Sequence, residues 1–250
     1  GYMTEEALME RSLETTDQKD PFIGTEEVLK DLIKDLALNP TSLNNYITCK
    51  RKFLYDNVLM LPGRKKQSLV FGNCVHKALE ETYKTYQKDK AFPHFKLFLE
   101  AFERELKFQG VDRSIELRCT DQAGTLKEWF DRASVNPILP RGLEKKLAIT
   151  IDDDILFAGK YDKVEWEDES KRLVRILDYK TGKPDDHLKS LDDCDDLAGD
   201  DCDEYLRQLV SYKLLYERDR MESRGNKVKC GVLVFVEPVS ADLRRLGYKK

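Results

Sequence analysis

The 250-residue sequence has no long hydrophobic run, and this absence limits what the protein can be. No stretch of about 18 consecutive apolar residues is present, so the sequence predicts no transmembrane helix. The N-terminal residues are polar and acidic, which is not the pattern of a secretory signal peptide. The sequence also lacks the G-x-x-x-x-G-K-[ST] phosphate loop, so we do not expect a P-loop ATPase.

Cysteine occurs at six positions but never as a C-x-x-C pair, the spacing typical of a metal or redox site. In a chain without a secretory signal, free thiols are favoured over disulfides. We therefore expect a protein of a reducing compartment, the cytoplasm. The six positions are Cys49, Cys74, Cys119, Cys194, Cys202 and Cys230.

Negative charge is concentrated in one segment. Residues 185–204 hold ten Asp or Glu and one Lys, a local charge of -9, whereas the whole chain carries -4. Subtracting the segment leaves +5 for the other residues, so the negative total does not exclude a nucleic acid partner. We interpret 185–204 as an acidic, solvated insertion.

The periodicity of apolar residues changes along the chain. Helical spacing dominates the N-terminal half, whereas short runs rich in β-formers, separated by charged turns, follow it. We expect helices over 24–37, from an N-cap at Thr41 or Ser42 to about Met60, after Gly72, and over 93–107, 119–134 and 203–221. We expect strands over 144–152, 155–167 and 172–180, antiparallel to one another, and over 229–238. This order predicts a mixed α/β core with a helical N-terminal half packed on it.

Two carboxylates and a lysine stand on strands that otherwise favour burial. Asp178 and Lys180 are two residues apart, so on a strand they share a face, and Tyr179 points the other way. Neighbouring strands lie about 5 Å apart, so Asp162 and Asp178 can hold one divalent cation between them. A lysine beside them could orient or deprotonate a water, which suits metal-assisted phosphodiester hydrolysis. The alternative is a solvated strand end with an ordinary ion pair.

The neighbouring residues favour the metal site. "FAGKYDKVE" (157–165) and "ILDYKTGK" (176–183) resemble the active-site core of the PD-(D/E)xK nuclease superfamily, and more narrowly its RecB/AddB branch. The patterns of that branch are G-x-x-D-[RK]-[IV] on one strand and D-[YF]-K-T-G on the next. Residues 39–62 resemble the opening segment of the branch, except that Asn39 stands where serine is usual and Lys50 where proline is usual.

The resemblance implies a set of site residues. "FGNCVHKALE" looks like the G-x-x-x-H motif, whose histidine, here His76, is a metal ligand. Asp162, Asp178 and the backbone carbonyl of Tyr179 would complete the ligands, with Lys180 as the catalytic lysine. The Q-x-x-x-Y motif falls on Gln208 and Tyr212, which share a helical face and would support the site. Glu144 matches a glutamate that opens the first strand, and could support the site indirectly.

The resemblance also implies a fold and an activity. The fold would be restriction-endonuclease-like, with one nuclease domain over 39–250 after a polar extension over 1–38. The activity would be a Mg²⁺- or Mn²⁺-dependent deoxyribonuclease, more in keeping with an exonuclease on single strands or ends than with a sequence-specific endonuclease. Partners would be DNA and a helicase motor domain or subunit, in repair or recombination, with no membrane involved.

Alternatives to this interpretation stay open. The fold could serve as a catalytically silent DNA-binding or partner-docking module of a helicase, although such modules usually lose one of the four motif residues that this chain keeps. The domain could be an unrelated α/β protein with chance matches. Some relatives carry an iron–sulfur cluster, but only Cys49 matches its cysteine pattern, so we expect no cluster and interpret Cys49 as a small buried hydrophobe. The acidic segment could lie near the active site and mimic DNA phosphate.

Overall fold

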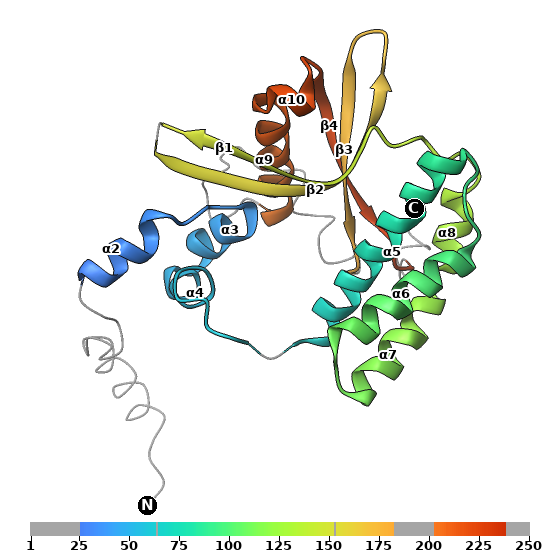
Figure 1. The fold of residues 1–250 in the computed structure, drawn as a ribbon, viewed down its shortest axis with the longest axis horizontal. Helices are drawn as coiled ribbons and strands as arrows, with labels where there is room; N and C mark the ends of the chain where they lie inside the picture. The colour runs from blue at the N-terminus through green and yellow to red at the C-terminus, as the bar shows by residue number, and fades with distance from the viewer. Residues whose placement is uncertain (1–25, 64, 153, 183–202, 239–250) are drawn as a thin grey trace, which may run out of the picture.

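A computed structural model describes residues 26–63, 65–152, 154–182 and 203–238. Figure 1 shows a mixed sheet with one long helix, α9, packed along it and a bundle of helices, α5 to α8, at its side. The strands are β1 (Gly142–Ile151), β2 (Ile155–Asp168), β3 (Leu173–Lys180) and β4 (Lys227–Phe235). The helices are α2 (Glu26–Lys34), α3 (Pro40–Thr48), α4 (Lys50–Phe53), the π-helical turn η2 (Leu54–Val58), α5 (Gln67–Asp89), α6 (Phe95–Gln109), α7 (Arg113–Gly124), α8 (Lys127–Ala133), α9 (Glu204–Arg218) and α10 (Arg220–Ser223).

The strands lie in the order β1-β2-β3-β4. The first three are antiparallel neighbours, as the sequence predicts, and β4 lies parallel to β3. A parallel neighbour requires a crossover connection, and α9 provides it. The expected fold class, a mixed sheet flanked by helices with a helical N-terminal half, is therefore confirmed.

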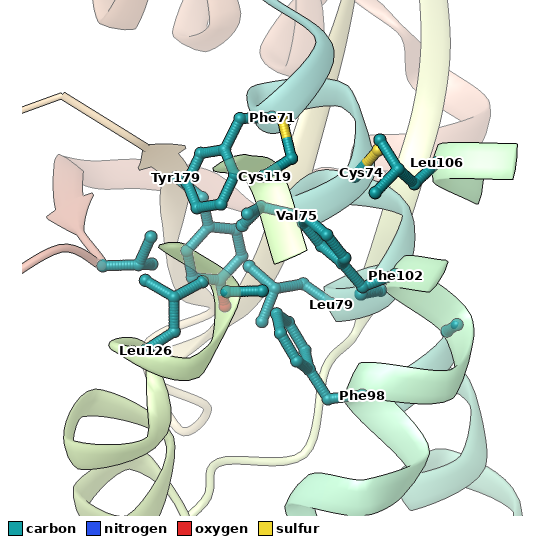
Figure 2. Packing of buried hydrophobic residues seen from close by; sticks show 14 of the residues in the cluster. Phe71, Cys74, Val75, Leu79, Phe98, Phe102, Leu106, Cys119, Leu126 and Tyr179 are labelled. Atoms are coloured by element: carbon teal, nitrogen blue, oxygen red, sulfur yellow. The ribbon is translucent and has the colours of Figure 1, made fainter. Parts of the chain in front are cut away.

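Two hydrophobic cores hold these layers together. One lies between the sheet and α9, where Phe157 and Val164 pack with Leu215. The other fills the bundle: Figure 2 shows Phe71 and Val75 of α5 near Phe102 of α6, with Tyr179 of β3 in the same cluster. Because Tyr179 is buried in this second core, the end of β3 is anchored against α5.

Several helix boundaries differ from the sequence-based expectation. The segment after residue 38 begins a helix at Pro40, not after Thr41 or Ser42, because Asn39 is the N-cap: its side chain accepts from the backbone N–H of Ser42, and the Ser42 hydroxyl accepts from the Asn39 N–H. Proline is favoured at the first helical position, where its missing N–H costs nothing. Asparagine caps as serine does, which explains why Asn39 stands in the serine position.

The helix expected up to Met60 is interrupted at Cys49. The backbone of Cys49 is extended, and its Sγ accepts a hydrogen bond from the N–H of Lys52 at 3.5 Å. Cys49 is therefore the N-cap of α4. Cys49 is exposed, and the interpretation as a buried hydrophobe was wrong.

Other boundaries shift as well. The helix expected after Gly72 begins six residues earlier, at Gln67. The single helix expected over 119–134 is two helices, α7 and α8. The helix expected over 203–221 ends at Arg218, and α10 follows it. Of the acidic segment 185–204, only Asp203 and Glu204 lie within the described residues. Among the described helices, none has the length and apolar character needed to cross a membrane.

Candidate active site

The two aspartates stand where β2 and β3 part. The last paired residues of the two strands at this end are Lys163 and Leu177, so Asp162 and Asp178 are the next facing positions. Oδ2 of Asp162 accepts from the backbone N–H of Tyr179 at 2.6 Å, in place of a further ladder hydrogen bond. Both aspartates are buried, 5% and 2% exposed. The sequence-based expectation that they lie on neighbouring strands is confirmed.

His76 reaches the same point from α5. Its Nδ1 lies 3.1 Å from Oδ1 of Asp162. Gly72 stands one turn earlier on α5, and a Cβ there would lie 3.3 Å from Oγ1 of Thr181, just after β3. The absence of a side chain at Gly72 therefore allows α5 to approach the end of β3 closely enough for His76 to contact Asp162.

Glu144 joins this pair from β1. It stands opposite Asp162 in the register of β1 and β2, although the two do not pair, and its φ is +48°. A non-glycine residue in the left-handed region stores roughly 1–3 kcal/mol of strain, which is found most often at functional sites. Oε1 of Glu144 lies 3.8 Å from Nδ1 of His76. Glu144 was expected to act only from outside the ligand set; its carboxylate instead lies in the same cluster as His76 and Asp162.

Lys180 is held by residues of β3 and α9. Its Nζ lies 2.7 Å from Oδ2 of Asp178 and donates to Oε1 of Gln208 at 2.6 Å. Gln208 in turn donates from Nε2 to the hydroxyl of Tyr212 at 2.7 Å. Because Gln208 and Tyr212 are one turn apart, the Q-x-x-x-Y spacing produces this chain of contacts.

The site residues predicted from the sequence, except Tyr179, line one cleft of about 450 Å³. The structure thus brings His76, Glu144, Asp162, Asp178, Lys180, Gln208 and Tyr212 together. Tyr179 turns its ring away into the core, stacked on Tyr83, as strand alternation predicts.

Burial and charge shift the proton affinities of these groups. Burial raises the pKa of Asp178 to about 6, and the charge of Asp162 adds to this effect, while Lys180 opposes it. Burial also lowers the pKa of His76, but hydrogen bonds to Asp162 and Glu144 and their charges outweigh it and raise that pKa to about 10. Several carboxylates buried together are stabilised by a nearby positive charge. In the metal-free protein, protonated His76 supplies that charge.

The residues fit a divalent metal ion. His76, Glu144 and Asp162 each offer one ligand atom, all within 4.8 Å of one another. Oδ2 of Asp178 is buried and forms an ion pair with Lys180. Carboxylate oxygens with one imidazole nitrogen suit a divalent cation.

Comparison with known families agrees with this geometry. The family model of the PD-(D/E)XK nuclease superfamily matches residues 37–246, most of the chain. The chain belongs to that superfamily. No curated protein gave a match to the chain. As a PD-(D/E)XK protein it belongs with metal-dependent nucleases acting on DNA, and its sheet and flanking helices are consistent with the restriction-endonuclease-like fold.

Sequence reasoning missed two residues of this PD-(D/E)XK site. Lys160 forms an ion pair with Glu144. It stands two residues before Asp162, so strand alternation places both on one face and could have revealed it. The ring of Tyr205 lies under Lys180, with Nζ 4.4 Å from its centroid. Tyr205 is three residues before Gln208 on α9, a spacing that also shares a helical face.

Proposed function

We propose that this protein is a RecB/AddB-like deoxyribonuclease that hydrolyses phosphodiester bonds with Mg²⁺ or Mn²⁺. One observation carries the proposal: a His–Glu–Asp ligand cluster and a half-buried lysine, contributed by separate elements, meet in one cleft. A surface ion pair would not require burial of two aspartates beside a strained Glu144.

The metal would be held by His76, Asp162, Asp178 and the backbone carbonyl of Tyr179, with Glu144 beside them. A bound divalent cation would polarise the scissile phosphate and lower the pKa of an attacking water. The hydrogen bond from the Tyr179 N–H keeps one oxygen of Asp162 engaged, so that the other is directed at His76. The aspartate is therefore oriented before any ligand arrives.

Lys180 would position the water and stabilise the negative charge that develops on the phosphate. Its ammonium is fixed between Asp178 and Gln208, and Tyr212 holds the amide of Gln208 in turn. This arrangement supplies a donor whose geometry is set before the substrate binds, which is what electrostatic catalysis requires.

The wider setting is proposed from the motifs. D-Y-K-T-G, G-K-Y-D-K-V and G-x-x-x-H resemble the branch whose nuclease domains work with helicases. We therefore propose an exonuclease acting on single strands or ends, joined to or partnered with a helicase in DNA repair or recombination, in the cytoplasm. We further propose one nuclease domain over 39–250, preceded by an extension over 1–38 and carrying the acidic insertion at 185–204.

The test is cleavage of end-labelled single- and double-stranded DNA with Mg²⁺, with Mn²⁺ and with EDTA. Asp178→Asn and Lys180→Ala should each abolish metal-dependent cutting. The matched controls are Asp168→Asn and Lys171→Ala, which break an Asp–Lys ion pair of 3.1 Å at the β2–β3 turn and should leave cutting intact. Cutting that survives the site substitutions would indicate a contaminant. DNA binding without any cutting would favour the silent binding module instead.

A further inference from the structure

The face of the β1–β2 hairpin that carries Glu144 and Asp162 continues outward from the cleft. In an antiparallel pair, side chains of facing residues share one face, and every second pair lies on that face. The register gives the next pairs on this face as Lys146 with Lys160 and then Ala148 with Ala158. The opposite face is closed by α9, since a Cβ at Gly159 would lie 2.6 Å from Leu215.

The lysine pair is unusual for a sheet. Like charges directly opposite each other on neighbouring strands are destabilising. The charge of Lys160 is paired with that of Glu144, but the side chain of Lys146 is exposed and makes no hydrogen bond or ion pair with any described residue. An anion lying over the pair would compensate the charge of Lys146, which has no partner of its own within the described part of the chain.

A trough of about 450 Å³ begins at this pair. Its walls and floor are Asn39, Lys146, Leu147, Ala148, Ala158, Gly159 and Lys160. Lys160 lines both the trough and the candidate active-site cleft, so the two are neighbours on this face. Beyond the lysines the lining is apolar except for Asn39, whose side-chain oxygen already accepts from the N–H of Ser42. The trough therefore offers little hydrogen-bonding pattern for reading bases.

We propose that Lys146 and Lys160 bind the DNA phosphate next to the one that is cleaved, and that the trough carries the single strand away from the metal cluster. This inference rests on the proposed nuclease function. Lys160 is two residues from Asp162, roughly 7 Å along the strand, a separation comparable to that of successive phosphates on one strand. The trough binds without regard to sequence, because only the phosphate is contacted by charge.

The far end of the hairpin limits the length of this track. Asp152 and Asp154 are exposed in the turn between β1 and β2. Asp152 is six residues from Lys146, roughly 20 Å along the strand. A strand that followed the hairpin to its tip would meet negative charge, so the site holds one phosphate and a short stretch of sugar and base.

Binding of a fluorescein-labelled single-stranded oligonucleotide, measured by anisotropy in EDTA across a salt series, tests the proposal without cleavage. Lys146→Gln should weaken binding about threefold to fivefold, the loss of one exposed ionic contact. It should also reduce the slope of log affinity against log salt by about 0.7, the value for one phosphate on a single strand. Lys146→Arg keeps the positive charge and should retain both the wild-type affinity and the wild-type salt slope. Lys171→Gln removes one charge from the β2–β3 turn and should change neither quantity.

A second experiment locates the contact. Each oligonucleotide of a series carries one neutral methylphosphonate, at a different position. At one position the substitution should lower the affinity of the wild-type protein but leave the affinity of Lys146→Gln unchanged. An unchanged salt slope for Lys146→Gln, or an equal loss for Lys171→Gln, would overturn the phosphate site. These measurements detect binding alone. The phosphate site can therefore be refuted while the wild-type protein still cleaves DNA, and it can be supported even if no cleavage is found.

Discussion

Nζ of Lys180 lies 2.6 Å from Oε1 of Gln208, a contact that joins the end of β3 to the first half of α9. The amide of Gln208 cannot rotate freely, because its Nε2 donates to the hydroxyl of Tyr212. The position of the lysine is therefore determined by the packing of a helix and not by β3 alone. This relationship gives the proposed catalytic lysine a support whose removal can be measured.

Gln208→Ala should lower kcat by about tenfold to a hundredfold with little change in KM, since a misplaced catalytic group costs up to about 10²-fold. Steady-state kinetics on a single-stranded substrate measure both constants. Val210→Ala, at a partly exposed position of the same helix and outside the cleft, is the control and should leave both unchanged. An unaltered kcat in Gln208→Ala would mean that Asp178 alone holds the lysine.

Tyr205 offers a second test of how Lys180 is held. The ammonium lies 4.4 Å from the ring centroid, and a cation–π contact contributes about 0.5–2 kcal/mol. Tyr205→Phe keeps the ring face and should retain most of kcat, whereas Tyr205→Leu should reduce it about threefold to thirtyfold. Equal activity of the two variants would show that the ring face does not act on the lysine. Thermal melting of both variants detects any separate loss of packing against Phe235.

Gly159 of the G-K-Y-D-K-V motif is predicted to be a packing requirement. An added Cβ would lie 2.6 Å from Cδ1 of Leu215, a buried residue of α9. Overpacking of this kind costs about 1–3 kcal/mol. Gly159→Ala should therefore lower the free energy of unfolding by that amount in urea titrations. Gly63→Ala, where nothing lies within 4 Å of the added Cβ, is the matched control and should change stability by less than about 0.5 kcal/mol. Equal stability of both variants would contradict the close approach of α9.

The sequence predicted the site better than it predicted the helices around it. Alternation on strands placed Asp178 and Lys180 together, and helical spacing placed Gln208 beside Tyr212. These relationships are local, so they follow from backbone periodicity. Helix limits depended instead on tertiary contacts, such as the one between Gly72 and Thr181, which keeps a glycine inside α5.

The place of Glu144 could not be derived from periodicity. Its backbone leaves the extended conformation at φ +48°, which no strand pattern announces. The sequence predicted a mixed sheet but not the partner of β4, because β4 is separated from β3 by a long stretch of chain. Pairings between distant segments follow from the packing of α9 on the sheet, which a single strand pattern does not contain.

Metal binding should strengthen as pH rises. The pKa of His76 is raised from its ordinary 6.5 to about 10 in the folded metal-free protein. Its protonated form therefore stabilises the fold fully below pH 6.5, and this contribution is lost as pH rises through 10. The pKa of Asp178 is raised from 3.8 to about 6, so stability also falls between those values as its carboxyl ionises. A metal needs both groups deprotonated, and so competes with these protons.

The increase in melting temperature caused by Mn²⁺ should consequently grow from pH 6 to pH 8.5, with release of about one proton per metal at pH 7.5. Differential scanning fluorimetry gives the first quantity, and calorimetry in buffers of different ionisation enthalpy gives the second. His94→Asn, at the N-cap of α6 and outside the cleft, should behave as the wild type, whereas His76→Asn should lose most of the pH dependence. A melting-temperature increase that is constant across this pH range would place the metal away from His76, because only competition with its proton links metal affinity to pH above 6.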